Sequence, residues 1–374
     1  MNKKQLLDTF SNPGNEYRGK PFWSWNGELE EHELIRQTHV MKEMGLGGYF
    51  MHSRTGLITE YLGDEWFDLI NAVADESSNI GMEAWLYDED RWPSGSAGGK
   101  VSADIKHRIK SIELFEMSLE HYKEHKDEFD RVLEIFTGNP EGLYCLHDYK
   151  RVSSQELEAM DKLADGYKVL LFKVSNERLN NNYNGNTYID TMSYEATAKF
   201  IELTHEKYKE KCGDRLGTSI KGIFTDEPHR GHLLDNLSEE KGVRQCKISY
   251  TNDMFEQFEL RYGYDVRAIL PELFYHIDGE RFSKARLNYV DLADNLFLER
   301  FAKPLNDWCI ENNIDFTGHV LHEDALTCQT EPQGSLMRFY EYQGVPGVDV
   351  LSEYNTCYWI VKQLASAARQ LGKT

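Results

Sequence analysis

Short apolar runs alternate along the chain with longer segments that have helical periodicity. The runs PFWSW (21–25), GGYFMHS (47–53) and MEAWLYDED (82–90) have the length and composition of strands. Between them, apolar residues recur at spacings of three and four over 30–44 and over 64–81. Near-continuous apolar strands separated by amphipathic helices are typical of a parallel sheet covered by helices.

The rhythm changes between about Ser111 and Val174. Several segments there have strand length and partial alternation of polar and apolar residues, and a helix near 153–164 interrupts them. We therefore expect a small, mostly antiparallel β insertion over residues 111–180. The strand–helix pattern resumes with a helix predicted at 193–211.

The second half of the chain continues the parallel pattern. Further strands are predicted at 220–228 (IKGIFTDEP), 314–324 (IDFTGHVLHED) and 347–353 (GVDVLSE), with a mostly helical stretch over 250–312 and a last helix over 354–371. Polar residues gather where these strands end, which is where (β/α)8 TIM-type barrels place their chemistry. Because no GxGxxG follows the first strand, a dinucleotide-binding sheet is disfavoured.

We expect an α/β fold, a (β/α)8 TIM-type barrel with a β insertion after its third strand. The predicted division is 1–110 and 181–374 for the barrel, with 111–180 as the insertion. Six strands are predicted and a closed barrel of this class has eight, so the barrel is expected to be incomplete at the C-terminus. A partial barrel exposes sheet edges, and a homo-oligomer that covers them is one expectation.

Charge and cysteine content narrow the range of partners. The 374 residues carry a formal net charge of −21, which disfavours nucleic acid and anionic membrane surfaces but not a neutral carbohydrate. The six cysteines form no CxxC pair and are expected to be reduced thiols. The start, MNKKQLLDTF, does not resemble a signal peptide, and no apolar run is long enough for a membrane span. These features predict a cytoplasmic protein.

The segment GIFTDEP (222–228) carries the sharpest chemical signal. An apolar strand delivers Asp226 and Glu227 to its end, and burial there would raise the pKa of a carboxyl toward the range of a general acid. The alternative is a carboxylate that caps the next helix. His229, directly after the motif, is a candidate for binding substrate.

A second cluster is GHVLHED (318–324). Its members are His319, His322, Glu323 and Asp324. A transition-metal site would need three or more of these side chains to converge. The other reading gives Glu323 a catalytic role and His319 a sugar contact.

The third motif is YDEDRWPSGSAGG (87–99). Its consecutive acids Asp88, Glu89 and Asp90 repel one another, so they need partners or a function. Sugar hydroxyl groups or a hard cation such as Ca²⁺ could supply it, with Trp92 as an aromatic platform. The alternative is a solvated acidic loop.

Three more residues at strand ends complete the candidate sugar-binding set: Trp25, His52 and Arg54. Carboxylates dominate these ends, and glycoside hydrolysis needs two carboxyl groups that flank the scissile bond. One protonates the leaving oxygen and the other activates water or attacks the sugar. No Gly-x-Ser-x-Gly elbow supports serine-hydrolase chemistry.

Several of these motifs together resemble family 106 glycoside hydrolases, the α-L-rhamnosidases and their relatives. The similarity covers roughly residues 20–105 and 190–370 and is carried by PFWSWNGELEEHELIRQ, MGLGGYFMHSRTGL, EAWLYDEDRWPSGSAGG, GIFTDEP and the stretch from GHVLHED to PGVDVLSE. The resemblance implies a bacterial enzyme with a (β/α) barrel, inverting hydrolysis by two glutamates, and often bound calcium.

Within the resemblance, Glu227 matches the fourth-strand acid position and Glu323 is the candidate base. Chains of this family continue into a further strand that carries a glutamate, so the base is otherwise expected beyond Thr374. A catalytically inactive, carbohydrate-binding barrel is the alternative function. A third hypothesis is that the protein is an enzyme that uses a transition metal, held by His319, His322 and Asp324, for non-hydrolytic chemistry.

Overall fold

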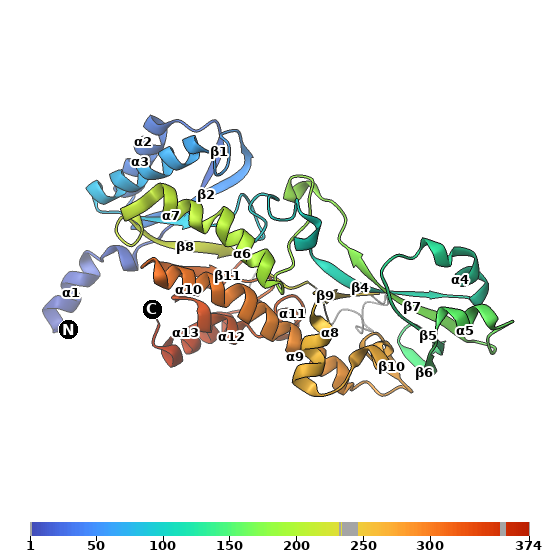
Figure 1. Cartoon of the computed structure of the whole chain (residues 1–374). Helices are drawn as coiled ribbons and strands as arrows, with labels where there is room; N and C mark the ends of the chain where they lie inside the picture. Colours follow the sequence, from blue (N-terminus) through green and yellow to red (C-terminus); the bar gives the residue numbers. More distant parts are fainter. Residues whose placement is uncertain (1, 232, 234–245, 352–356, 374) are drawn as a thin grey trace.

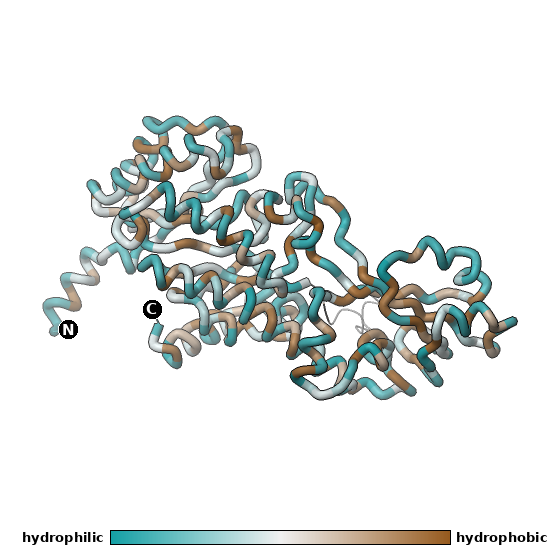
Figure 2. Tube along the Cα trace, viewed as in Figure 1, coloured by the Kyte–Doolittle hydropathy of each residue, from teal (hydrophilic) through white to brown (hydrophobic). Residues whose placement is uncertain are grey.

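The computed structural model describes residues 2–231, 233, 246–351 and 357–373, and within them the chain forms two six-stranded sheets. One sheet is parallel and lies with its helices in one half of an elongated molecule (Figure 1). The other sheet extends away from it in the opposite half. Both sheets are hydrophobic along their strands, and hydrophilic residues follow the outer turns (Figure 2).

The parallel sheet contains the strands that the apolar runs predict. Their order in the sheet is β1 (Phe22–Gly27), β2 (Gly48–Leu57), β3 (Glu83–Tyr87), β8 (Ile220–Asp226), β11 (Asp315–His319) and β12 (Val345–Pro346). Every neighbouring pair is parallel. The α/β class with a parallel sheet is therefore confirmed. The described residues supply six strands, so the complete eight-stranded barrel stays a prediction.

The last predicted strand is misplaced. GVDVLSE (347–353) was expected to form it, but pairing with β11 ends at Pro346. Val350 and Leu351 are exposed, so their apolar character does not mark a buried strand. Residues 352 and 353 lie outside the described residues.

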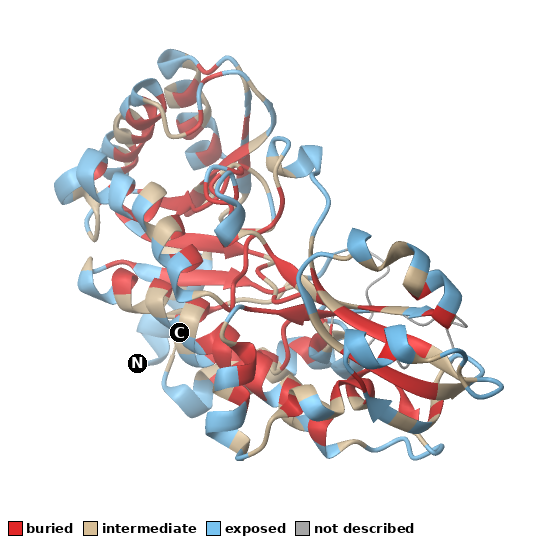
Figure 3. Cartoon of the chain, turned by 45° about the vertical axis from the view of Figure 1, so that its right-hand side comes forward, coloured by how far each residue is buried: buried red, intermediate tan, exposed pale blue. Residues whose placement is uncertain are grey.

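Helices cover the parallel sheet where the periodicity predicts them. They are α2 (Glu31–Glu43), α3 (Asp64–Ile80), α6 (Tyr194–Leu203), α7 (His205–Cys212), α10 (Lys303–Glu311) and α13 (Trp359–Leu371). The helix α9 (Lys284–Phe297) packs instead against the helical segment Val266–Leu273, and its Tyr289 hydroxyl donates to the carbonyl of Ser249 in the second sheet. The helix α3 ends at Gly81, whose φ of 68° is the left-handed conformation that favours glycine. Figure 3 shows that the strands between these helices are buried along most of their length.

The second sheet contains the predicted insertion and more. Its order is β10 (His276–Ile277), β6 (Cys145–Arg151), β5 (Val132–Glu141), β7 (Lys168–Asn176), β4 (Lys110–Met117) and β9 (Lys247–Tyr250). Its strands pair antiparallel, except that β10 is parallel to β6. The strands β9 and β10 come from outside 111–180, and β10 interrupts the stretch predicted to be mostly helical.

The predicted helix near 153–164 is shorter, α5 (Ser154–Ala159). In the part of the chain that the structure describes, no helix is both long enough and apolar enough to cross a bilayer.

Candidate active site

A chain of direct contacts crosses four strands at the carboxyl end of the parallel sheet. The His52 ring stacks on Tyr87 with ring centroids 3.7 Å apart. The Tyr87 hydroxyl donates to Asp226 Oδ2 at 2.5 Å, and Asp226 Oδ1 lies 2.8 Å from His319 Nε2. These residues come from β2, β3, β8 and β11, and the two-residue period of each strand turns their side chains to one face.

Asp226 and His319 form a buried ion pair. Burial alone would raise the pKa of Asp226, but its contacts with His319 and Tyr87 lower it overall. Burial likewise opposes the charge of His319, but hydrogen bonding and attraction to Asp226 raise its pKa to about 9. The site therefore holds an ionised aspartate and a protonated histidine at neutral pH.

His52 is neutral and has free ring nitrogens. Burial and the nearby Arg54 lower its pKa to about 4. The residue is 2 % exposed, and neither nitrogen has a hydrogen-bond partner among the described residues. A buried polar group without a partner is costly, so it is a natural contact for a hydroxyl group of a ligand.

Glu227 follows Asp226 at the end of β8 and is half-buried. Its φ of 48° lies in the left-handed region, which is uncommon for a residue other than glycine. Its amide donates to the carbonyl of His319 at 3.1 Å, which fixes this conformation. Burial and the charge of Asp226 raise the pKa of Glu227, as a general acid requires.

Glu323 lies deeper, at 4 % exposure. Its oxygens accept from the amides of Val320 at 3.4 Å and Asp349 at 2.5 Å, and one lies 3.9 Å from His319 Nδ1. Burial raises its pKa to about 8. The structure thus brings Glu323 to the Asp226–His319 pair, where it also fastens the loop after β12.

The acidic run after β3 has protein donors for most of its carboxylate oxygens, but the buried Asp88 Oδ2 has no partner among the described residues. Asp88 accepts from the Ser94 hydroxyl at 2.5 Å, and Asp90 accepts from Ser53 at 2.7 Å. Glu89 receives the amides of five residues, namely Asp90, Gly95, Ser96, Ala97 and Gly98. Because amide donors repel a cation, Glu89 does not fit as a ligand of the calcium ion that the resemblance implies. The acids of this run shape the loop that carries Trp92.

Arg54 and Trp92 meet at the edge of the site. The guanidinium carbon lies 4.4 Å from the centre of the indole ring, and Trp92 is 42 % exposed. A cavity of about 270 Å³ beside them is lined by Arg54 and Asp90 among others. An exposed ring beside charged groups is the arrangement that sugar faces and hydroxyl groups can use.

Other predicted residues lie elsewhere. Trp25 is 1 % exposed and packs under α3 against Trp66, with ring centroids 5.2 Å apart. Because β1 alternates, Trp25 faces the helices and not the strand-end site. His229 stacks on Tyr188 at 4.4 Å and lines a separate cavity of about 320 Å³.

The transition-metal reading of GHVLHED is wrong for the described residues. His319 is buried against Asp226, whereas His322 and Asp324 are exposed. The three do not appear in the one cluster of metal-binding side chains found in the described ranges. The physical reason is that the chain leaves β11 at His319 and turns, so its successive side chains diverge.

Sequence reasoning missed Tyr87 and Ser94. Tyr87 links His52 to Asp226, and the Ser94 hydroxyl accepts from the Asp226 amide at 2.8 Å. The alternation of Trp85 and Tyr87 along β3 was the available signal for Tyr87. Nothing local marks the link from Ser94 to the site, because Asp226 is distant in sequence.

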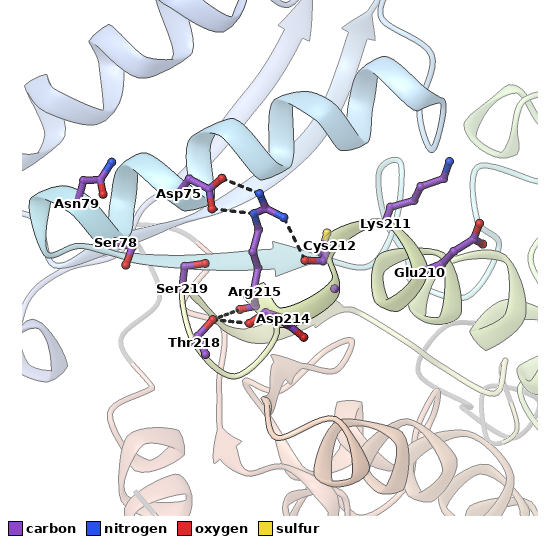
Figure 4. A pocket seen from close by; sticks show the side chains of 11 residues that line it. Asp75, Ser78, Asn79, Glu210, Lys211, Cys212, Asp214, Arg215, Thr218 and Ser219 are labelled. Atoms are coloured by element: carbon purple, nitrogen blue, oxygen red, sulfur yellow. Dashed lines mark hydrogen bonds and ion pairs between the residues drawn. The ribbon is translucent and has the colours of Figure 1, made fainter.

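A larger hollow lies at the opposite end of the sheet. It has a volume of about 510 Å³ and is lined by the end of α3, the end of α7 and the start of β8. Figure 4 shows its main feature, the Asp75–Arg215 pair with oxygen–nitrogen distances of 2.6 and 2.7 Å.

Comparison with known proteins finds a similar fold in a solved structure and distant sequence similarity to a curated protein. No protein-family profile matches the chain. The solved rhamnosidase from Novosphingobium sp. PP1Y superposes with a TM-score of 0.58 at 13 % identity, over 97 % of this chain and 52 % of that one. A Formosa agariphila protein named "Putative beta-glucuronidase" is 20 % identical over 370 residues, 84 % of this chain and 30 % of its own length. The chain thus spans about half of one and under a third of the other.

Proposed function

We propose that this chain is part of a glycoside hydrolase that cleaves a terminal sugar, an α-L-rhamnoside in the first instance, and that it is related to glycoside hydrolase family 106. The observation that carries the proposal is the end of β8, where a half-buried Glu227 with a raised pKa adjoins an ionised Asp226. Environments that shift the pKa values of two neighbouring carboxyl groups in opposite directions are typical of acid–base catalysis. The names of the two similar proteins support the same reaction class.

Glu227 is the proposed general acid, which protonates the oxygen of the leaving group. Burial and the ionised Asp226 beside it disfavour a negative charge on Glu227 and raise its pKa, which favours the protonated form that a general acid needs. Glu323 is the proposed second carboxylate, which in its ionised form takes a proton from the attacking water. Because its pKa is raised to about 8, this role predicts activity that increases as the pH rises toward about 8. Inversion at the sugar carbon follows if water attacks directly.

The sugar is proposed to bind between His52 and the Arg54–Trp92 pair. His52 offers its unpartnered nitrogens to hydroxyl groups, and Arg54 covers one side of the Trp92 ring. The exposed part of Trp92 is then available to an apolar sugar face. Arg54 would also accept a carboxylate, so a uronic acid is the runner-up substrate.

A panel of aryl glycosides tests the proposal. The chain is incubated with aryl α-L-rhamnoside and aryl β-D-glucuronide, and the anomer released is followed by NMR from the first turnover. Release of the inverted anomer by the wild type but not by Glu227→Gln supports the proposal. Calorimetric binding of sugar without any product would favour the alternative, a carbohydrate-binding barrel that does not cleave. Neither binding nor cleavage of any panel member would overturn both.

A further inference from the structure

The tip of the β5–β6 hairpin gathers three different metal-binding side chains on the second sheet, away from the strand-end site (Figure 1). Glu141 is the last residue of β5 and pairs directly with Cys145, the first residue of β6. His147 lies two residues further along β6 and therefore on the same face as Cys145. The register of the hairpin thus converges a carboxylate, a thiol and an imidazole.

The distances suit one small ion. His147 Nε2 lies 3.0 Å from Glu141 Oε2 and 3.3 Å from Cys145 Sγ. The three potential ligand atoms lie within 4.8 Å of one another. Zinc bonds of about 2.3 Å to sulfur and about 2.0 Å to nitrogen, at a tetrahedral angle, put these ligands about 3.5 Å apart. The two distances from His147 Nε2 are close to this separation, and a small rotation of the Glu141 or Cys145 side chain would adjust the third, which lies within 4.8 Å.

Asp278 holds the other side of the histidine. Its carboxylate lies 2.7 Å from His147 Nδ1, and its own amide donates to the carbonyl of Leu146 at 3.1 Å. When Nδ1–H donates to Asp278, the lone pair of Nε2 points toward Glu141 and Cys145. Histidine ligands of metals are oriented by a carboxylate in this way.

We propose that Glu141, Cys145 and His147 bind a zinc-like transition-metal ion, with Asp278 as the residue that positions His147. A thiolate and an imidazole together select a borderline or soft ion and disfavour calcium and magnesium. Three protein ligands leave a fourth position for water or another ligand. The bound ion would tie the hairpin to the segment of β10.

The rival explanation needs no metal. A protonated His147 between two carboxylates would also be stable, since hydrogen bonds to Asp278 and Glu141 raise its pKa. That arrangement gives Cys145 only a weak hydrogen bond with His147 Nε2 and does not require a thiolate. The thiol therefore distinguishes the two explanations.

Cobalt titration of the whole chain, after treatment with a chelator, tests the proposal. Co²⁺ bound by a thiolate gives a charge-transfer band in the near ultraviolet and visible bands of tetrahedral intensity. We expect one equivalent to bind, zinc to displace it, and excess magnesium to leave it in place. Cys145→Ser should abolish the charge-transfer band, and His147→Gln should weaken binding at least tenfold. Asp278→Asn should weaken it about 10- to 100-fold without changing the stoichiometry.

Cys328→Ser is the matched control, because Cys328 is a partly buried thiol outside the cluster. It should bind cobalt like the wild type. The proposal is overturned if the wild type gives no charge-transfer band, or if the band survives Cys145→Ser. The Glu141 side chain is 78 % exposed, so Glu141→Gln should fold normally. It should also weaken cobalt binding, which keeps the test decisive if another variant fails to fold.

Discussion

The two ends of the parallel sheet differ in how deeply their ion pairs are buried, and the volumes of their cavities do not show this difference. The hollow at the amino end is the larger, at about 510 Å³, against about 270 Å³ beside Arg54 at the carboxyl end. Its ion pair, Asp75–Arg215, has side chains that are 54 % and 34 % exposed. The Asp226–His319 pair at the other end is only 11 % and 9 % exposed. Water screens the first pair and not the second.

This difference favours the carboxyl end of the sheet as the place for acid–base catalysis. In a parallel sheet all strands deliver the residues after them to the same end, so groups distant in sequence meet there. Burial then shifts the pKa values of several carboxyl and imidazole groups that meet there, whereas at the amino end the charged groups of the Asp75–Arg215 pair stay partly exposed. Substitutions at the carboxyl end should therefore affect activity and stability more than substitutions at the amino end.

The largest effect is expected for Glu227→Gln. Loss of a general acid should lower kcat about 10²- to 10⁴-fold on substrates whose leaving group needs protonation. With a dinitrophenyl glycoside the dinitrophenolate ion leaves without a proton, so kcat on this substrate should fall much less. Asp75→Asn at the opposite end is the control and should leave both rates unchanged. Equal losses on both substrates would contradict the acid role.

Breaking the buried pair should be the next largest effect. Asp226→Asn or His319→Gln leaves an uncompensated buried charge, so each should lower the free energy of unfolding by about 3–5 kcal/mol in urea denaturation. The double variant should cost less than the sum of the single ones. Additive, small costs would mean that the two groups do not interact.

The stability difference between wild type and His319→Gln should depend on pH. Because the pKa of His319 is raised from 6.5 to about 9, its contribution is full below pH 6.5 and is lost as the pH rises through about 9. The lowered pKa of Asp226 keeps the pair intact down to acidic pH. Urea denaturation at pH 6 and pH 10 should show the difference shrinking. A constant difference would argue against the pair.

The smallest effect is expected at the amino end. Arg215→Ala should cost less than about 1 kcal/mol, because its partner is exposed and solvent already screens the pair. Activity should not change. A loss as large as that of His319→Gln would remove the distinction between the two ends.

The sequence predicted the elements well where local periodicity determines them. The strands β4, β5, β6 and β7 follow from alternation, and α3 follows from its apolar stripe and Gly81. The strand β10 has only two residues and forms by pairing with the edge strand β6. A pairing between segments so far apart in sequence leaves no local pattern from which to predict it. The end of the sheet at β12 is set by the reach of its pairing with β11 and not by the apolar residues after it.

Residue type predicted the neighbourhood of the candidate site better than the roles within it. Asp226, Glu227, His319 and Glu323 do gather where their strands end. Trp25 was misplaced because an aromatic residue on a strand of unknown orientation can face either the helices or the site. The acid Glu89 has donors that lie up to nine residues away, so its use as the anchor of a loop required the folded chain.

The path of the chain between the two sheets has a mechanical consequence. After β8 it crosses to the second sheet, adds β9 to one edge and β10 to the other, and then returns to form β11 (Figure 1). The strands of the two sheets therefore alternate along the sequence: β8 of the parallel sheet lies between β7 and β9 of the second sheet. Excision of residues 111–180 would leave β9 and β10 as orphan edges, open to aggregation. The segment 111–180 thus shares a sheet with strands from later in the chain, and the two sheets should unfold in a single transition.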